Sequence, residues 1–344
     1  MRDYLSTKLT ALGLPWRIDA KGNLLTAPGP AIPEKPKVVV TAHLDEIALL
    51  VNRIYPDGSL GVAPLGGVFV WKWGEGQVEI LAGDGAILPG ILSLGSIHTT
   101  APGTAIQNAR EGRAPSWPDA YVRTGLSPRN LAAVGVRVGT RIVLARERRK
   151  LFPIGGGLLG SWFLDDRADL VAWLLCLERL APPSPVPHGG VSRGTRRTGD
   201  TGEILFVATA AEEIGGHGAL WALGHARPEV CLALELGPLS PDTDAQLSST
   251  PTCWVADGYA PTNPSDLALV QRAADACGTG VQFQALSRGG SDASCAAAQG
   301  LCARPITLAF PCDNSHGFEV MHEDAIESLA RLTVETLAQL AKEA

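Results

Sequence analysis

The chain has 344 residues, of which 45% are hydrophobic and 19% are charged, and its formal net charge is −6. This composition is typical of a globular protein, and the acidic balance argues against a nucleic-acid partner, which a basic stripe would indicate. The sequence has no apolar run of about eighteen residues, so it predicts no membrane span. The seven cysteines form no C-x-x-C pair, and we interpret them as reduced core thiols of a cytoplasmic protein.

The N-terminal segment predicts a helix, a hairpin and a buried strand in that order. Apolar residues at helical spacing predict a helix over residues 3–13. The sequence RIDAKGNLLTAP predicts a hairpin that turns at residues 21–23. A buried strand of the parallel type follows at residues 38–41, and the polar residues His43 and Asp45 come directly after it.

The segment over residues 55–153 differs from its flanks in composition and in its pattern of apolar residues. Glycine is dense, and short strand-like runs such as QVEIL and RIVLARE follow one another without a long amphipathic helix. This pattern is typical of a small all-β barrel or sandwich. Because α/β sequence lies on both sides of it, we expect residues 55–153 to be an insertion that serves in dimerisation or oligomerisation.

Strands and helices alternate again in the last part of the chain, which indicates a mostly parallel sheet flanked by helices. The predicted catalytic domain is therefore an α/β unit made of residues 1–54 and 154–344. Residues 182–202, rich in Pro, Gly and Arg, predict a surface loop. We expect helices at residues 169–180, 267–277 and 322–342, and a further helix that begins at residue 218. We expect strands at residues 230–236 and 306–310, and another in the first part of residues 203–213.

Side chains with metal-binding chemistry recur directly after these predicted strands. Ligands bind open α/β sheets at the carboxyl ends of the strands, and divalent metals need imidazole nitrogens and carboxylate oxygens that converge from different elements. A single histidine after a strand is more often structural, but a solvated surface does not explain five such placements. The predicted metal ligands are His43, Asp165, Glu213, Glu235 and His316.

Several segments match the motifs of one known family. The sequence TAHLDEIALLV (41–51) is similar to A-H-x-D-E-I/V-G, and FLDDRAD (163–169) is similar to L/F-D-D-R-x-G. Further along, ATAAEEIGGHGA (208–219) is similar to T-x-x-E-E-x-G-x-x-G-A, and SRGGSDASCAAAQG (287–300) to G-G-T/S-D-A. Within the insertion, PGILSLGSIH (89–98) is similar to P-G-V-I-G-x-x-x-x-H. The chain thus resembles peptidase family forty-two of the metallopeptidases, which are glutamyl, leucyl and lysyl aminopeptidases with a zinc-peptidase-like fold.

The resemblance implies two divalent metal ions, of zinc, cobalt or manganese, that share Asp165 as a bridging carboxylate. The remaining ligands would be His43 with Glu235 for one ion, and Glu213 with His316 for the other. Because a divalent ion lowers the pKa of the water that it binds, a nearby carboxylate must take the proton, and the resemblance gives that role of general base to Glu212. We count Asp45 with the catalytic residues, as a partner that orients the His43 imidazole; its alternative role is a turn residue.

Three residues are candidate substrate contacts. His98, in the insertion, matches a family histidine that reaches the active site of a neighbouring subunit, and its alternative is a plain barrel-surface residue. Asp292 could bind a substrate amine, although capping of the next helix is the simpler interpretation. Gly290 belongs to a tight turn where the backbone is expected to approach the site.

The sequence departs from the family pattern at several positions. Asp169 stands where the family has Gly, and Glu235 where it often has Asp. The family's Arg-Tyr before the last histidine is replaced by residues 313–315, which leaves the substrate contacts there open. His322 is a rival for His316 as the last ligand, but we expect His322 to begin the terminal helix.

Three functions follow from these patterns. The first is an aminopeptidase that hydrolyses N-terminal residues from short peptides. The second is a related deacylase or amidohydrolase that acts on N-acyl amino acids, because a fold does not fix a substrate. The third is a catalytically silent scaffold, which has no need to keep the ligand set. The insertion and the resemblance together predict a homo-oligomer built from dimers, as large as a dodecamer.

Overall fold

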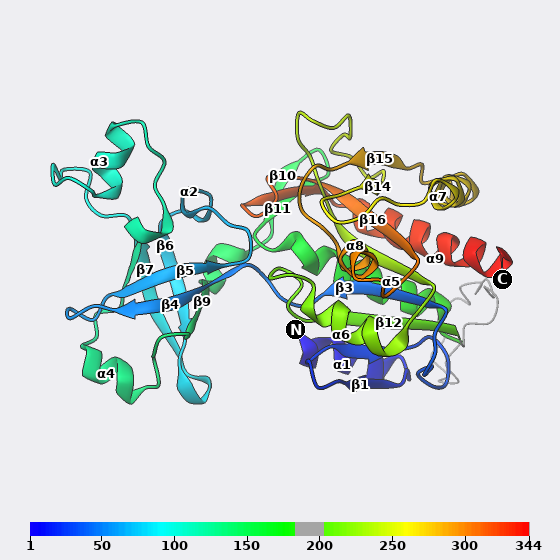
Figure 1. Ribbon diagram of the computed structural model, residues 1–344, viewed down its shortest axis with the longest axis horizontal. Helices are drawn as coiled ribbons and strands as arrows, with labels where there is room; N and C mark the ends of the chain where they lie inside the picture. Colours follow the sequence, from blue (N-terminus) through cyan, green and yellow to red (C-terminus); the bar gives the residue numbers. More distant parts are fainter. Residues whose placement is uncertain (183–202, 344) are drawn as a thin grey trace.

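The structure, a computed structural model, describes residues 1–182 and 203–343. It consists of an eleven-stranded mixed sheet with helices on both faces and, beside it, a closed β-barrel (Figure 1). This arrangement confirms the predicted α/β fold with an inserted all-β unit. The loop expected over residues 182–202 lies, apart from its first residue, outside the described part of the chain.

The N-terminal helix and hairpin form as predicted. The helix is α1 (Arg2–Ala11), and the hairpin pairs β1 (Trp16–Ile18) with β2 (Leu24–Thr26) in antiparallel register. The Asp19 carboxylate accepts hydrogen bonds from three backbone N–H groups of the turn, those of residues 21–23. A short polar side chain thus stabilises the turn between the two strands.

The centre of the large sheet is parallel, and antiparallel strands extend it on both sides, apart from one parallel pair in a side branch. Four buried strands run in the same direction at the centre, in the order β12 (Ile204–Thr209), β3 (Val38–His43), β13 (Val230–Pro238) and β16 (Arg304–Asp313). The hairpin β1–β2 extends one side through an antiparallel pair of β2 with β12. The other side continues antiparallel through β17 (Glu319–His322), β11 (Leu158–Ser161) and β10 (Phe152–Gly155), and the side branch pairs β14 (Thr252–Ala256) antiparallel with β16 and parallel with β15 (Gln282–Ala285).

Helices cover both faces of this sheet. The larger core lies under α5 (Leu164–Leu180) and α9 (Ala325–Glu343), with α7 (Pro264–Cys277) packed against α9. In it, the rings of Trp173 and Phe206 meet edge-on at 5.6 Å between centroids. The smaller core lies on the opposite face under α6 (His217–Ala226) and α8 (Asp292–Ala298). Burial of apolar side chains on both faces fixes the parallel strands at the centre, since each large one contributes about 1.5–3 kcal/mol.

Three predicted helix starts were wrong, one of them that of α7, which begins at Pro264 and not at residue 267. The terminal helix begins at Ala325, not at His322, which is the last residue of β17 and pairs with Leu158 of β11. Helix α5 begins at Leu164, five residues earlier than predicted, although the backbone of its second and third residues is not helical.

The insertion is a closed six-stranded barrel around the buried side chains of Trp73, Leu131 and Ile142. Its strands, in order around the barrel, are β4 (Ala48–Ile54), β5 (Leu60–Leu65), β8 (Tyr121–Arg123), β7 (Ile87–Ser93), β6 (Gly76–Leu81) and β9 (Arg141–Leu144). Short helices connect them, namely α2 (Val70–Trp73), η1 (Gly83–Gly85), α3 (Ala105–Arg110), η2 (Trp117–Asp119), α4 (Pro128–Ala133) and η3 (Arg146–Arg149). The barrel begins before the predicted boundary at residue 55, because β4 is already one of its strands.

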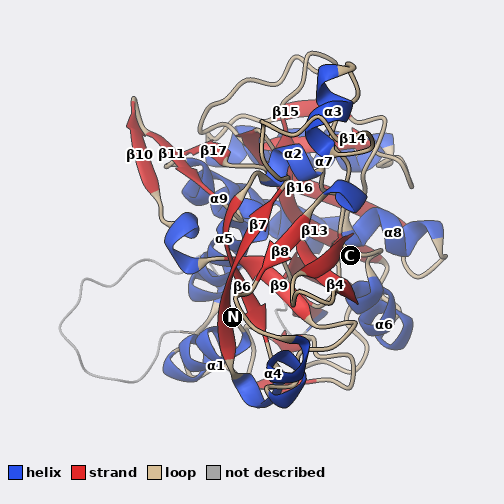
Figure 2. Cartoon of the chain, turned by 90° about the vertical axis from the view of Figure 1, so that its left-hand side faces the viewer, coloured by secondary structure: helices blue, strands red, loops and turns tan. Residues whose placement is uncertain are grey.

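Charged side chains tie the barrel to the sheet domain. Arg149 lies 3.5 Å from Glu46 and 3.3 Å from Glu79, measured between guanidinium nitrogen and carboxylate oxygen. Glu46 also pairs with Arg167 of α5, and the ring of Phe163 lies 5.9 Å from both guanidinium groups. Viewed from the barrel side, β10 and β11 project from the margin of the sheet (Figure 2). No helix in the described ranges is long and apolar enough to cross a membrane, and all seven cysteines are free thiols.

Candidate metal centre

The ends of the central strands bring the predicted ligands to one edge of the sheet. His43 is the last residue of β3 and pairs in register with Thr209, the last residue of β12. Glu212 and Glu213 follow in the loop directly after β12, and Glu235 lies within β13, the other neighbour of β3. The valine-rich run of β3 places His43 at this edge because a strand buried on both faces must carry apolar side chains up to its end.

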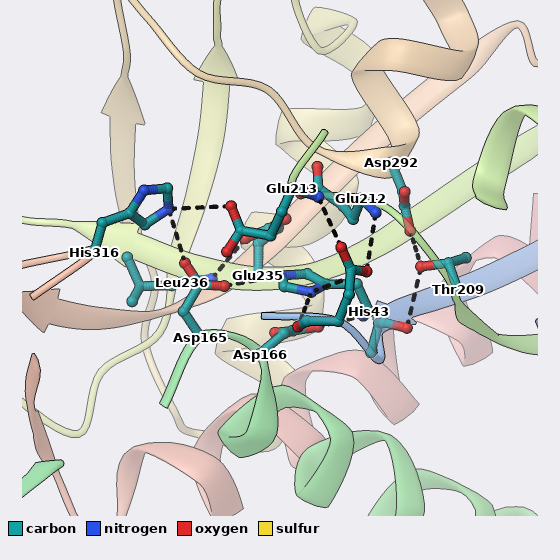
Figure 3. Close-up of polar contacts among 12 residues, drawn as sticks. His43, Asp165, Asp166, Thr209, Glu212, Glu213, Glu235, Leu236, Asp292 and His316 are labelled. Carbon is teal, nitrogen blue, oxygen red and sulfur yellow. Dashed lines mark hydrogen bonds and ion pairs between the residues drawn. The ribbon is translucent and has the colours of Figure 1, made fainter. Parts of the chain in front are cut away.

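Asp165 lies between the two histidines, as Figure 3 shows. Its Oδ1 is 2.8 Å from Nε2 of His43, and its Oδ2 is 3.4 Å from Nε2 of His316. The same nitrogen of His316 lies 3.6 Å from Oε2 of Glu213. The carboxylate of Asp165 thus has one oxygen directed to each imidazole.

Main-chain carbonyl groups orient both imidazoles. Nδ1 of His43 lies 3.1 Å from the carbonyl oxygen of Asp45, and Nδ1 of His316 lies 2.7 Å from that of Gly67. A proton on each Nδ1 leaves Nε2 free to bind a metal. The orienting contact predicted for the Asp45 side chain is therefore corrected: its carboxylate is 3.9 Å from Nδ1 of His43, beyond hydrogen-bond distance.

The Asp45 carboxylate instead holds the loop that carries the two glutamates. It accepts hydrogen bonds from the backbone N–H of Glu212, at 3.0 Å, and of Glu213, at 3.3 Å. The same loop packs tightly against Gly218, where an added Cβ would lie 2.2 Å from the carbonyl oxygen of Ala210. Only glycine allows this close approach, so the loop is fixed from two sides.

The side chains of this edge fit divalent metal ions. Three groups place their ligand atoms within 4.8 Å of one another, and these are His43–Asp165–Asp166, His43–Glu212–Glu235 and Asp165–Glu213–His316. Burial raises the pKa of Glu213 to about 7, and the nearby Asp165 carboxylate adds to the rise. Burial and the Glu212 carboxylate likewise raise the pKa of Glu235 well above its ordinary value. Buried carboxylates that repel one another are stabilised by a cation, and mixed nitrogen and oxygen ligands suit zinc, cobalt or manganese.

Two buried acids support the ligands and were not assigned a role from the sequence. Glu319 of β17 accepts a hydrogen bond from the backbone N–H of Asp165, at 3.2 Å, and another from that of His316, at 3.0 Å. Asp166 accepts one from the backbone N–H of His43 at 2.5 Å. The only sequence signal for Asp166 is its place in the D-D-R motif. The role of Glu319 could not be predicted from the sequence, because its hydrogen-bond partners, the backbone N–H groups of Asp165 and His316, are identified only in the folded chain.

The metal edge opens into a pocket of about 420 Å³. Apolar and aromatic side chains line it together with the acidic ligands and Arg288; the apolar members are Leu236, Pro238, Trp254, Tyr259 and Leu286. Gly290 also lines the pocket, and its Cα lies so close to the Tyr259 ring that an added Cβ would be 2.2 Å from Cδ2. The pocket lining therefore combines acidic side chains with side chains suited to an apolar group.

The other candidate residues lie away from the pocket lining. Asp292 is buried and accepts a hydrogen bond from Oγ1 of Thr209 at 2.6 Å, while Ser291 caps helix α8. His98 is exposed on a loop of the barrel. His322 lies near Asp324, with Nδ1 3.9 Å from its carboxylate, so His316 is the histidine that joins the cluster.

Comparisons with known proteins identify the family of this chain. The model of the M42 glutamyl aminopeptidase family matches residues 22–332. The lysyl aminopeptidase of Pyrococcus furiosus is 29% identical over 238 residues, which are 69% of this chain and only 60% of that protein's length.

Solved structures share the fold. The TET1 peptidase of Pyrococcus horikoshii superposes with a TM-score of 0.78 at 22% identity, over 97% of this chain and 92% of the other. An aminopeptidase of the archaeon Desulfurococcus kamchatkensis gives 0.79 at 22% identity, over 99% and 89% of the two chains. The family model covers most of the sequence, and the chain therefore belongs to the M42 glutamyl aminopeptidase family.

Proposed function

We propose that this protein is an aminopeptidase that uses two divalent metal ions to hydrolyse N-terminal residues from short peptides. The observation that carries the proposal is the position of Asp165 between two imidazoles, with one carboxylate oxygen near each. Asp165 would be shared by both ions. The other ligands would be His43 and Glu235 for the first ion, and Glu213 and His316 for the second.

The two ions, when bound, would polarise the scissile carbonyl group and lower the pKa of the attacking water. Glu212 is the carboxylate left without a ligand role in the proposed set, and it lines the same pocket. Burial raises its pKa well above the ordinary value, and the charge of His43 opposes the rise. A carboxylate with a raised pKa can take a proton from the water and return it to the leaving amine near neutral pH. Asp45 is a positioning residue that fixes the backbone of Glu212.

The family supports a peptide with a free amino group as the substrate, because the matching family and the relative from Pyrococcus furiosus are aminopeptidases. Four carboxylates gather at the metal end, those of Asp165, Glu212, Glu213 and Glu235. Two divalent ions would balance their charge, so the choice of substrate rests on the family and not on the charge of the lining. The deacylase is therefore the second candidate. If the protein releases acetate from N-acetyl amino acids but no amino acid from aminoacyl anilides, the aminopeptidase proposal is wrong.

The substitution Glu212→Gln tests the mechanism. It keeps the size of the side chain and removes the base, so kcat should fall by about 10²–10⁴-fold. Glu178→Gln on α5, which alters an exposed glutamate, is the matched control and should keep full activity. Metal content measured on both variants should equal that of the wild type. An unchanged kcat for Glu212→Gln would remove Glu212 from the mechanism.

We also propose that the protein is a homo-oligomer. The TET1 peptidase of Pyrococcus horikoshii, which shares the fold, assembles into a tetrahedron or a large octahedral shell. In this chain, the stacked rings of Phe69 and Trp71 are 64% and 54% exposed, and Phe152 on the edge strand β10 is 61% exposed. Exposed apolar side chains that lie in contact, as this stacked pair does, are typical of surfaces covered by a partner. A light-scattering mass equal to one chain would contradict this proposal.

A further inference from the structure

The loop that carries His316 is held in an unfavourable backbone conformation. Asn314 has φ 61° and His316 has φ 57°, which is the left-handed region that side chains other than glycine adopt at a cost. Such a conformation persists only when surrounding contacts fix it. Contacts within the sheet domain supply part of this, because Nδ2 of Asn314 donates to the carbonyl oxygen of Phe318 at 2.9 Å, and Glu319 accepts the backbone N–H of His316 at 3.0 Å.

The remaining contacts come from the barrel. The carbonyl oxygen of Gly67 lies 2.7 Å from Nδ1 of His316, and the ammonium group of Lys72 donates to the carbonyl oxygen of Ser315. Lys72 belongs to the short helix α2 and is half-buried. The carboxylates of Glu319 and Asp313 are the charges that face its ammonium group from the sheet domain. The barrel therefore reaches the residue directly before the last predicted ligand.

We infer that Lys72 is a positioning residue for the second metal ion, and that the barrel thereby forms part of the metal centre. This inference rests on the proposed two-metal function. Lys72 fixes the carbonyl group of Ser315, and so the left-handed turn that directs Nε2 of His316 towards Asp165 and Glu213. The first ion would have its ligands on β3, β13 and α5, and within the described ranges no hydrogen bond or ion pair joins Lys72 to His43, Asp165 or Glu235.

The size of the effect follows from the place of Lys72 in the chain of contacts. Removal of a partner that orients a ligand typically weakens metal binding by about 10–100-fold. Lys72 acts one residue before His316, while Gly67 and Glu319 still hold His316 itself. We therefore expect Lys72→Met to weaken the binding of the second ion by about tenfold, at the lower end of that range, and to leave the affinity for the first ion unchanged.

The test is a titration of metal-free wild-type and variant protein with Co²⁺, followed by calorimetry and by the visible absorption of the bound ion. Lys72→Arg keeps a charged donor and should restore binding of the second ion. Lys150→Met is the matched control, because Lys150 is exposed on the same barrel segment. Circular dichroism and the thermal unfolding midpoint establish that each variant is folded.

The outcomes separate the inference from the function on which it rests. A wild type with two sites, a Lys72→Met variant that is weakened at one of them, and rescue by Lys72→Arg together support the inference. Two wild-type affinities in Lys72→Met overturn it and leave the two-metal proposal intact. Equal loss at both sites, or no rescue by Lys72→Arg, also overturns it, because the role of Lys72 is then merely structural. Fewer than two ions on the wild type overturns the two-metal proposal and this inference with it.

Discussion

Replacement of Asp45 by Asn separates two roles that one residue serves. The carboxylate accepts the backbone N–H groups of Glu212 and Glu213, whereas the main-chain carbonyl contacts His43. Asn keeps the carbonyl and one side-chain oxygen, but it presents an amide N–H₂ to the second backbone donor. One hydrogen bond to a charged group is lost, which is worth about 1.5–3 kcal/mol. Because about 1.36 kcal/mol corresponds to a tenfold change in rate, kcat should fall by roughly 10–150-fold if Glu212 shifts with its backbone.

The affinity for the first metal ion should stay within about threefold of the wild type, since the carbonyl that orients His43 is unchanged. The assay is steady-state hydrolysis of an aminoacyl anilide at saturating metal, paired with a metal titration of the same preparations. Suppose that Asp45→Asn lowers the affinity for the first ion by about tenfold or more, while kcat of the metal-loaded enzyme is unchanged. The Asp45 carboxylate then acts on His43, although it lies 3.9 Å from Nδ1 of that ring, and the assigned role is wrong.

Three further predictions follow. His316→Ala should retain one equivalent of metal and lose the second, as measured by metal analysis after dialysis; retention of both ions would exclude His316 as a ligand. Burial raises the pKa of Glu213 to about 7. In the metal-free protein the contribution of this carboxyl group to the free energy of unfolding is therefore largest below about pH 4.5, where the group is protonated, and is lost as the pH rises through 7. The gain in unfolding temperature on adding Zn²⁺ should therefore be larger at pH 8 than at pH 5.5, and equal gains would contradict this. Gly218→Ala should destabilise the protein by about 1–3 kcal/mol through overpacking and lower kcat, because its Cβ would meet the backbone of Ala210 at 2.2 Å. Gly224→Ala, where a Cβ would meet nothing within 4 Å, is the control in urea unfolding and should be neutral or stabilising.

The candidate ligands could be proposed from the sequence because the ends of buried strands can be recognised in it. The apolar runs before His43 and Glu235 fix where each strand lies, and parallel strands share the edge at which they end. His316 could not be separated from His322 by this argument, since both follow the last predicted strand. The structure separates them through the turn at residues 314–316 and the short strand β17, neither of which has a periodic pattern.

Contacts made by the backbone explain what the sequence could not predict. The role of Asp45 depends on which of its oxygens meets which neighbour, and a residue type carries no such information. The barrel boundary was placed too late because the alternation of β4 resembles a continuation of the segment after β3. Lys72 gave no signal at all, since its partner Ser315 is more than two hundred residues away in the chain.

The contact between Glu46 and Arg149 has a consequence for the order of folding. These residues are 103 positions apart in sequence, yet they lie 3.5 Å apart at the two ends of the barrel segment. A barrel that folds first therefore shortens the loop between the register partners His43 and Thr209 from 166 residues to about 63. Loop-closure entropy grows with the logarithm of loop length, so the early barrel lowers the closure free energy of the β3–β12 pair by about 0.8 kcal/mol. An inserted domain that folds early would thus aid formation of the sheet that it interrupts, and we expect refolding of the barrel to precede pairing of β3 with β12.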